Sequence, residues 1–172
     1  MNEIRKASVE DLPDILKIMQ EAREFLAEQG IDQWQGVYPA AENILPDLSK
    51  EAAYVVSTDG QISAYFAIIM GDDIMYHTIS QGSWSNESTD FVTVHRLAVS
   101  QAFRGRGINK LIWDFVFKVG KSQGYTDFRA DTHADNKIMQ AALLKMGFEK
   151  RGLIVYKDEK ILTTCIAYQK EF

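Results

Sequence analysis

The chain has 172 residues, of which 46% are apolar and 25% charged, and its net charge is −5 at neutral pH. This length suits one core that buries roughly two-thirds of the unfolded chain's surface, and the composition excludes a disordered or membrane-embedded protein. The sequence has no apolar run near the ~20 residues that span a bilayer, no signal-peptide pattern at its start and no long basic run for nucleic acid. We therefore expect one cytoplasmic enzyme domain over residues 1–172 that binds neither membrane nor nucleic acid. The single cysteine, Cys165, fits a reducing compartment.

Amphipathic helices and short strands alternate along the first ninety residues. A strand comes first, and Ser8 with Asp11 three residues later resembles a capping box, which opens a helix that ends at Gly30. A loop with two aromatic residues then leads to a short helix and to two strands joined by a hairpin turn. The predicted elements are strands at 4–7, 52–57, 62–70 and 74–79, helices at 8–29 and 41–48, and loops at 33–39 and 81–90.

The second half of the chain is organised around a strand, a glycine-rich turn and a helix. The strand covers residues 91–99, and the helix after the turn carries apolar residues at helical spacing up to Gly124. A strand with alternating polar residues, a last helix and a closing hairpin of residues 149–156 and 161–168, which turns at 158–160, follow. This order of elements predicts a mixed sheet with helices on both sides.

The turn over residues 104–109 reads Arg-Gly-Arg-Gly-Ile-Asn and has the composition of an anion-binding site. Its glycines let the backbone curl tightly and remove Cβ atoms that would block a phosphate. The first amides of the next helix lack intrahelical partners and lie at the positive end of the helix dipole, and Arg104 and Arg106 add full charges. No Walker motif fits, and Lys110 replaces the third glycine of a dinucleotide motif. We predict a pyrophosphate site here, with an ordinary strand-to-helix turn as the alternative.

This turn and a second motif resemble those of the Gcn5-related N-acetyltransferase (GNAT) superfamily. Arg-x-x-Gly-x-Gly/Ala after a strand ending Leu-Ala-Val is the pattern at which its members bind acetyl-CoA, apart from Asn109 in place of a small residue. About thirty residues later, Asn136, Gly147 and Phe148 match its next motif. The resemblance covers residues 92–152 and, through the order of elements, the whole chain. It implies an α+β fold, an α/β/α sandwich with a mixed, mostly antiparallel sheet of six to seven strands and helices on both faces.

The same resemblance implies an acetyl-CoA-dependent N-acetyltransferase that acts on a primary amine of a small molecule or peptide by direct attack in a ternary complex. The pantetheine arm would pair with the strand, the pyrophosphate would lie on the turn, and the thiol end would lie near Asn136. Many relatives have a Tyr at the position of Leu143 to reprotonate the thiolate, so the usual general acid is missing. The residues predicted to bind acetyl-CoA are Leu97, Ala98, Val99, Arg104, Gly105, Arg106, Gly107, Ile108, Asn109 and Asn136.

Three side chains are candidates for removing the proton of an alkyl amine, whose pKa near 10 otherwise keeps it charged. Strand alternation places His95 on one face with Thr93 and Leu97. Asp131 and His133 alternate at the end of the next strand, where a histidine can relay a proton at neutral pH and the carboxylate can orient it. The alternative is that Asp131, His133 and Asp135 cap the following helix and fix the splay between two strands.

The acceptor is expected near three aromatic residues in loops, Trp34, Tyr38 and Trp84, which can grip a cation or an apolar group. The alternative is that these rings close the core.

Cys165 is predicted to be a buried small hydrophobe and not a nucleophile, and no His/Cys spacing indicates a metal site. Two other functions stay open: a sensor or scaffold that binds acyl-CoA without efficient turnover, and a fold that uses the turn for ATP. The sequence does not specify the amine or the oligomeric state, for which a homodimer is compatible.

Overall fold

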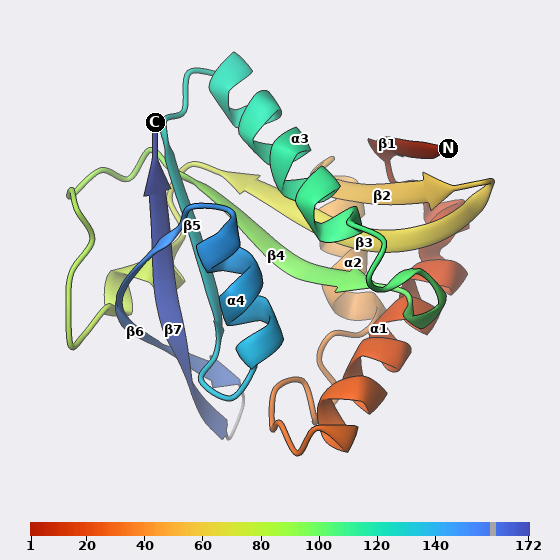
Figure 1. Ribbon diagram of the computed structural model, residues 1–172, viewed down its shortest axis with the longest axis horizontal. Coiled ribbons are helices and arrows are strands. Elements are labelled where there is room, and N and C mark those ends of the chain that lie inside the picture. The colour runs from red at the N-terminus through yellow and green to blue at the C-terminus, as the bar shows by residue number, and fades with distance from the viewer. Residues whose placement is uncertain (159–160) are drawn as a thin grey trace. The chain divides into compact units, whose positions relative to one another are not determined.

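The computed structural model describes residues 1–158 and 161–172, and this part of the chain contains seven strands, four α-helices and three short 3-10 helices (Figure 1). In chain order they are β1 Asn2–Lys6, η1 Val9–Asp11, α1 Leu12–Glu28, α2 Ala41–Ser49, β2 Ala53–Thr58, β3 Gln61–Met70, η2 Ile74–Thr78, β4 Val92–Val99, η3 Gln101–Phe103, α3 Ile108–Ser122, β5 Asp127–His133, α4 Lys137–Lys145, β6 Glu149–Asp158 and β7 Ile161–Glu171. The predicted turn at 158–160 includes residues 159–160, which lie outside the described residues.

The strands form one mixed sheet in the order β1-β2-β3-β4-β5-β7-β6. Pairing is antiparallel between β1 and β2, β2 and β3, β5 and β7, and β6 and β7, whereas β4 and β5 are parallel. The predicted mixed, mostly antiparallel sheet of six to seven strands is therefore confirmed. None of the helices in the described ranges is long and apolar enough to cross a membrane.

The chain divides into two compact units. The first unit consists of Met1–Ile68 and Val94–Asp114, and the second of Ile69–Thr93 and Phe115–Phe172. Both units therefore contain segments that are far apart in the sequence. The single domain over residues 1–172 stays a prediction.

The first unit is built on the apolar faces of α1 and α2. Side chains from these helices form one buried cluster with residues of β2, β3 and β4. The start of α1 follows the expected local chemistry, because the carboxylate of Asp11 accepts a hydrogen bond from the Ser8 amide at 2.8 Å. Gly30 has φ +69° just beyond the helix, as expected for a C-terminal glycine. The predicted capping box and helix end are confirmed, although a short 3-10 turn precedes α1.

In the second unit the register between β5 and β7 sorts the side chains of β5 onto two faces. Arg129, Asp131 and His133 lie opposite Gln169, Ala167 and Cys165 of β7, and Phe128 lies opposite Lys170. On the first of these faces, a buried cluster contains Tyr76, Phe91, Ile154, Cys165 and Ala167. On the second, the ring of Phe117 in α3 packs edge-on against Phe128, with centroids 5.1 Å apart. The predicted alternation along β5 is confirmed.

One predicted element is wrong: the segment 74–79 is not a strand, and Ile74–Thr78 within it form the 3-10 helix η2. The carboxylate of Asp73 accepts a hydrogen bond from the Met75 amide at 3.1 Å, and the Asp73 carbonyl accepts one from the Tyr76 amide at 2.9 Å. These local bonds satisfy the backbone within the segment and compete with strand pairing. The first pairing beyond η2 is a single antiparallel bridge between Ser80 and Leu153.

Candidate active site

The glycine-rich turn joins η3 to α3 in the first unit. Gly105 has φ +76° and Gly107 has φ +77°, a region that L side chains adopt only with strain. Apart from the glycine and its two chain neighbours, no residue has an atom within 4 Å of the position that a Cβ would take at either glycine. The backbone is thus open on the side where a side chain would otherwise stand, immediately before the first turn of a 15-residue helix. These are the features that a pyrophosphate cradle requires.

The two arginines of the turn have different surroundings. Arg104 folds back, since its Nε donates to the carbonyl of Val99 and its Nη2 to that of Glu21, both at 3.3 Å. Its guanidinium also lies over the ring of Phe25, 4.2 Å from the centroid. Arg106 is exposed. Arg104 therefore fixes the conformation of the turn, and Arg106 carries the charge that faces solvent.

The strand β4 that leads to the turn contains a left-handed residue in its middle. Arg96 has φ +54°, so the regular alternation of side chains is interrupted between His95 and Leu97. The shared face of Thr93, His95 and Leu97 therefore stays a prediction, because regular alternation does not extend through Arg96. Both His95 and Leu97 are half-buried.

A buried ion pair holds Arg96. Its Nε and Nη2 donate to the two carboxylate oxygens of Asp47 in α2 at 2.7 and 2.6 Å, and the two side chains are 14% and 7% exposed. The hydroxyl of Tyr65 donates to the same carboxylate at 2.7 Å, and burial, followed by the charge of Asp47, raises the pKa of Tyr65 above its usual value. Arg96 also donates through Nη1 to the hydroxyl of Tyr38 at 3.0 Å. Sequence reasoning missed Asp47 and Tyr65, because a carboxylate on a short helix usually faces solvent.

The loop before α2 carries two of the predicted acceptor residues. Trp34 and Tyr38 make an edge-to-face contact with ring centroids 6.3 Å apart. Trp34 also packs against the buried cluster of the first unit, which supports the core-closing alternative for this ring. Tyr38 is half-buried and is joined to β4 through Arg96.

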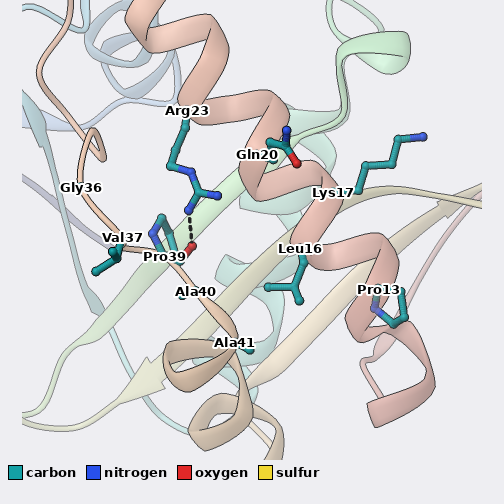
Figure 2. Close-up of a pocket in the computed structure, with 10 residues that line it drawn as sticks. All are labelled: Pro13, Leu16, Lys17, Gln20, Arg23, Gly36, Val37, Pro39, Ala40 and Ala41. Atoms are coloured by element: carbon teal, nitrogen blue, oxygen red, sulfur yellow. Dashed lines mark hydrogen bonds between the residues drawn. The ribbon is translucent and has the colours of Figure 1, made fainter.

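A shallow hollow of about 750 Å³ lies between α1 and this loop. Figure 2 shows the residues that line it, with the Arg23 guanidinium donating to the carbonyl of Pro39 at 2.6 Å. Its lining does not include Trp34, Tyr38 or any residue of the glycine-rich turn. Because the hollow is separate from the residues that carry the chemistry, we do not assign the reaction to it.

In the second unit, Asp131 lies between two tyrosines. Its Oδ1 accepts hydrogen bonds from the hydroxyls of Tyr76 and Tyr156, each at 2.8 Å. Burial, and after it the charge of Asp131, raises the pKa of both hydroxyls, so both remain protonated donors. Cys165 is 4% exposed, and burial raises the pKa of its thiol too. The prediction that Cys165 is a buried small hydrophobe is confirmed.

His133 and Asn136 both take part in the start of α4. The Nδ1 atom of His133 accepts a hydrogen bond from the Asp135 amide at 3.1 Å, and the side-chain oxygen of Asn136 accepts one from the Met139 amide at 3.1 Å. Asn136 is the N-cap residue of the helix, which satisfies an otherwise unpaired amide. These bonds support the capping alternative for His133. Leu143, at the position of the missing general acid, is 1% exposed and belongs to the core.

Trp84, the third predicted acceptor residue, is held by contacts within the second unit. Its ring stacks on Tyr76 with centroids 5.5 Å apart, and its Nε1 donates to the Tyr76 carbonyl at 2.8 Å. The guanidinium of Arg129 lies 4.5 Å from the centroid of the same ring. The predicted site residues are thus divided between the two units. His95, the strand 97–99, the turn 104–109, Trp34 and Tyr38 lie in the first unit, and Trp84, Asp131, His133 and Asn136 lie in the second.

Comparison with known proteins identifies the family of this chain. The model of the acetyltransferase (GNAT) family matches residues 15–148. A GNAT-family acetyltransferase of Streptococcus agalactiae 2603 is 34% identical, with 99% of this chain and 95% of that chain covered and a TM-score of 0.84. The chain therefore belongs to the GNAT acetyltransferase family. It is an enzyme that transfers acetyl groups, with the α+β fold of the acyl-CoA N-acyltransferases.

A curated relative and a further solved structure are also similar to this chain. The uncharacterized N-acetyltransferase YesJ of Bacillus subtilis (strain 168) is 24% identical over 148 residues, which are 85% of this chain and 81% of YesJ. The ribosomal-protein-alanine N-acetyltransferase of Brucella melitensis is 18% identical and shares the fold with a TM-score of 0.71 over 99% of both chains. Both similarities extend over most of the chain.

Proposed function

We propose that this acetyltransferase uses acetyl-CoA as its donor and acetylates a primary amine of a small molecule or peptide, by direct attack in a ternary complex. The observation that carries the proposal is the open turn before α3. Gly105 and Gly107 have φ +76° and +77°, and no atom beyond the neighbouring residues lies within 4 Å of either Cβ position, which leaves room for a pyrophosphate beside the backbone. A cytoplasmic location is part of the proposal and is supported by the one cysteine, Cys165, which is a free thiol.

The residues proposed to hold acetyl-CoA follow β4 and the turn. The amides of Arg104, Gly105, Arg106, Gly107, Ile108 and Asn109 would bind the pyrophosphate, and the backbone at Leu97, Ala98 and Val99 would bind the pantetheine arm. Asn136, which also caps α4, would contact the thiol end. Acetyl-CoA supplies a thioester carbonyl as electrophile and a thiolate as leaving group. A backbone amide of β4 would stabilise negative charge on the carbonyl oxygen, an effect that lowers such barriers by about 3–4 kcal/mol.

The amine must lose its proton, and His95, Asp131 and His133 remain the candidates for accepting it. The hydrogen bonds described above weigh on two of them. Asp131 already accepts two tyrosine hydroxyls, and the Nδ1 of His133 already accepts an amide, so each would have to give up a structural contact to act as a base. The variants H95Q, D131N and H133Q separate the three. Loss of the acidic limb of the pH–rate profile in one variant alone would identify the base.

We propose that Trp34, Tyr38 and Trp84 shape the acceptor site. Tyr38 is the strongest of the three candidates, because its hydroxyl contacts Arg96 beside the proposed pantetheine strand. Trp34 and Trp84 make packing contacts, which support a role in lining the acceptor site. A homodimer is compatible with this proposal, and its existence is checked by light scattering of the purified protein.

The experiment that tests the function is calorimetric titration of the purified protein with acetyl-CoA, with ATP and NAD as controls. A micromolar Kd for acetyl-CoA alone is expected, followed by release of free thiol in a screen of small primary amines and peptides. Thiol release with none of the amines, despite tight binding, would support the sensor or scaffold instead. Absence of acetyl-CoA binding would reject the assignment of the turn.

A further inference from the structure

The unusual feature of β4 is its left-handed residue. Five non-glycine residues in the described ranges have positive φ, namely Trp34, Glu51, Asp59, Gln81 and Arg96. The first four lie in turns or loops, whereas Arg96 lies in the middle of a strand. A long side chain with a Cβ avoids this conformation unless its surroundings hold it there. The contacts of Arg96 therefore identify what maintains the bend.

Arg96 and Asp47 form a bidentate ion pair, which we call the fork. Asp47 receives the Nε and Nη2 atoms of Arg96 on its two oxygens at 2.7 and 2.6 Å, so the plane of the guanidinium is fixed as well as its position. Tyr65 donates to the same carboxylate, which leaves Asp47 little freedom to move. Because Asp47 lies on α2 and Tyr65 on β3, the bend of β4 is set by the first unit's own core.

We infer that Asp47 is a positioning residue, which holds Arg96 in the left-handed conformation and thereby aims the amides of Leu97–Val99. This inference rests on the proposed function, in which those amides receive the pantetheine arm and the thioester carbonyl. A bend one residue earlier decides the direction in which each following amide points. An error of about 1 Å in the position of reacting groups lowers catalysis about 100-fold, so loss of the fork is expected to reduce turnover strongly.

Tyr38 extends the same arrangement to the acceptor loop. Its hydroxyl accepts a hydrogen bond from Nη1 of Arg96. This nitrogen does not take part in the ion pair with Asp47. One guanidinium thus joins α2, β4 and the loop before α2. The ordinary alternative is that the ion pair only stabilises the fold, as buried pairs elsewhere do.

The positioning role and the purely stabilising role predict different kinetics for the variant D47N. The chain offers a matched control for this variant. Asp11 also accepts two hydrogen bonds from one arginine, through Nη1 and Nη2 of Arg5 at 2.7 and 2.8 Å, and this pair belongs to β1 and η1 of the first unit. D47N and D11N each replace one carboxylate oxygen of a bidentate pair by an amide. For D47N we expect kcat for thiol release, with the amine that the screen identifies, to fall about 10- to 100-fold. The Kd for CoA should rise by a smaller factor than kcat falls, since the pyrophosphate cradle is unaltered and only the contacts of the pantetheine arm are weakened. For D11N, kcat should stay within about twofold of the wild-type value.

A rescue variant and a measurement without substrate complete the test. Glycine adopts φ +54° without strain. The kcat of D47N/R96G should therefore be at least about fivefold higher than the kcat of D47N. Hydrogen exchange of the Leu97–Val99 amides should be at least tenfold faster in D47N and unchanged in D11N. If D47N does not fold, R96K carries the same measurements, because lysine keeps the charge and loses the fork.

The outcomes separate this inference from the proposed function. If wild-type protein binds acetyl-CoA and D47N shows wild-type kcat and amide exchange, the positioning role is rejected and the proposed function stands. Equal losses in D47N and D11N also reject it, since they would reflect stability alone. If the wild-type protein fails to bind acetyl-CoA, the proposed function is rejected, and with it the inference that rests on it.

Discussion

Arg96 in the first unit is half-buried and Arg129 in the second is buried, and each forms an ion pair with an aspartate. Arg129 is 2% exposed and bonds Asp127 two residues earlier on the same strand, through Nε at 3.1 Å and Nη2 at 2.8 Å. The same Nη2 donates to Asn86 and to the carbonyl of Ser88, each at 3.1 Å, which fastens the polar loop before β4. Aromatic rings complete its surroundings, with the Phe91 centroid 4.0 Å away.

The backbone at the two positions differs. Arg129 has no positive φ, and its strand pairs regularly with β7, whereas Arg96 has φ +54° within the continuous strand β4. The pair of Arg129 therefore orders a loop around regular structure, and the pair of Arg96 maintains an irregular one. Burial and hydrogen bonding alone do not distinguish an arginine that orders a loop from one that maintains an irregular strand. The backbone conformation of the arginine distinguishes them, and substitutions can test this comparison.

The largest effect is expected for R129L, and it should be an effect on stability. The change leaves the buried carboxylate of Asp127 without its cation, although Gln169 still donates to it at 2.9 Å. Breaking a buried pair in this way costs about 3–5 kcal/mol, which corresponds to a Tm roughly 10 °C lower. At 20 °C the folded variant should keep its kcat. A large loss of kcat with an unchanged melting curve would erase the distinction between the two arginines.

The second prediction asks whether the turn after β4 binds the donor. Gly107→Ala places a methyl group in the open space beside the proposed cradle, so the Kd for acetyl-CoA should rise at least about tenfold. Gly124→Ala is the matched control, because Gly124 has φ +89° with equally open surroundings at the end of α3. Both variants should lose about 1–2 kcal/mol of stability from the strained backbone. Equal acetyl-CoA affinity in the two variants would remove the cradle from the proposal.

A third, smaller effect is expected for Tyr38→Phe. The variant loses one hydrogen bond to Arg96 and leaves the fork to Asp47 intact. We expect kcat to fall about threefold, less than in D47N, because one bond to a charged group is lost and the bend is kept. Steady-state kinetics with the amine from the screen measure this. A loss as large as that of D47N would mean that the loop, and not α2, sets the conformation of β4.

The sequence predicted features that depend on neighbouring residues and missed those that depend on distant ones. The glycine turn, the helix after it and the capping box at Ser8 are determined within a few residues, and each is present. Arg96 and its partner Asp47 are 49 residues apart, and no local pattern indicates that they meet. The segment 74–79 has the apolar residues of a strand, but Ile74–Thr78 form η2, whose first turn is capped by the carboxylate of Asp73. The proton acceptor stayed undecided for the same reason, since the partners of Asp131 come from positions 76 and 156.

The smallest effect concerns a third ion pair, between Arg5 and Asp11, which tests whether exposure weakens such a pair. Hydrogen bonds from Arg5, ahead of the opposing effect of burial, hold the pKa of Asp11 below its usual value. A depressed pKa stabilises the fold above the unfolded pKa near 3.9 and loses that contribution as the pH falls through the folded pKa. Because the Arg5 side chain is 42% exposed, the contribution should be about 1 kcal/mol, or a Tm difference of roughly 2–4 °C between wild type and D11N at pH 7. Thermal melts between pH 7 and pH 2 should show this difference shrinking below pH 4. A difference that persists at pH 2 would mean that Asp11 stabilises the start of α1 through its hydrogen bonds to Ser8 and not through its charge, and the three arginine pairs would then no longer form one series ordered by burial.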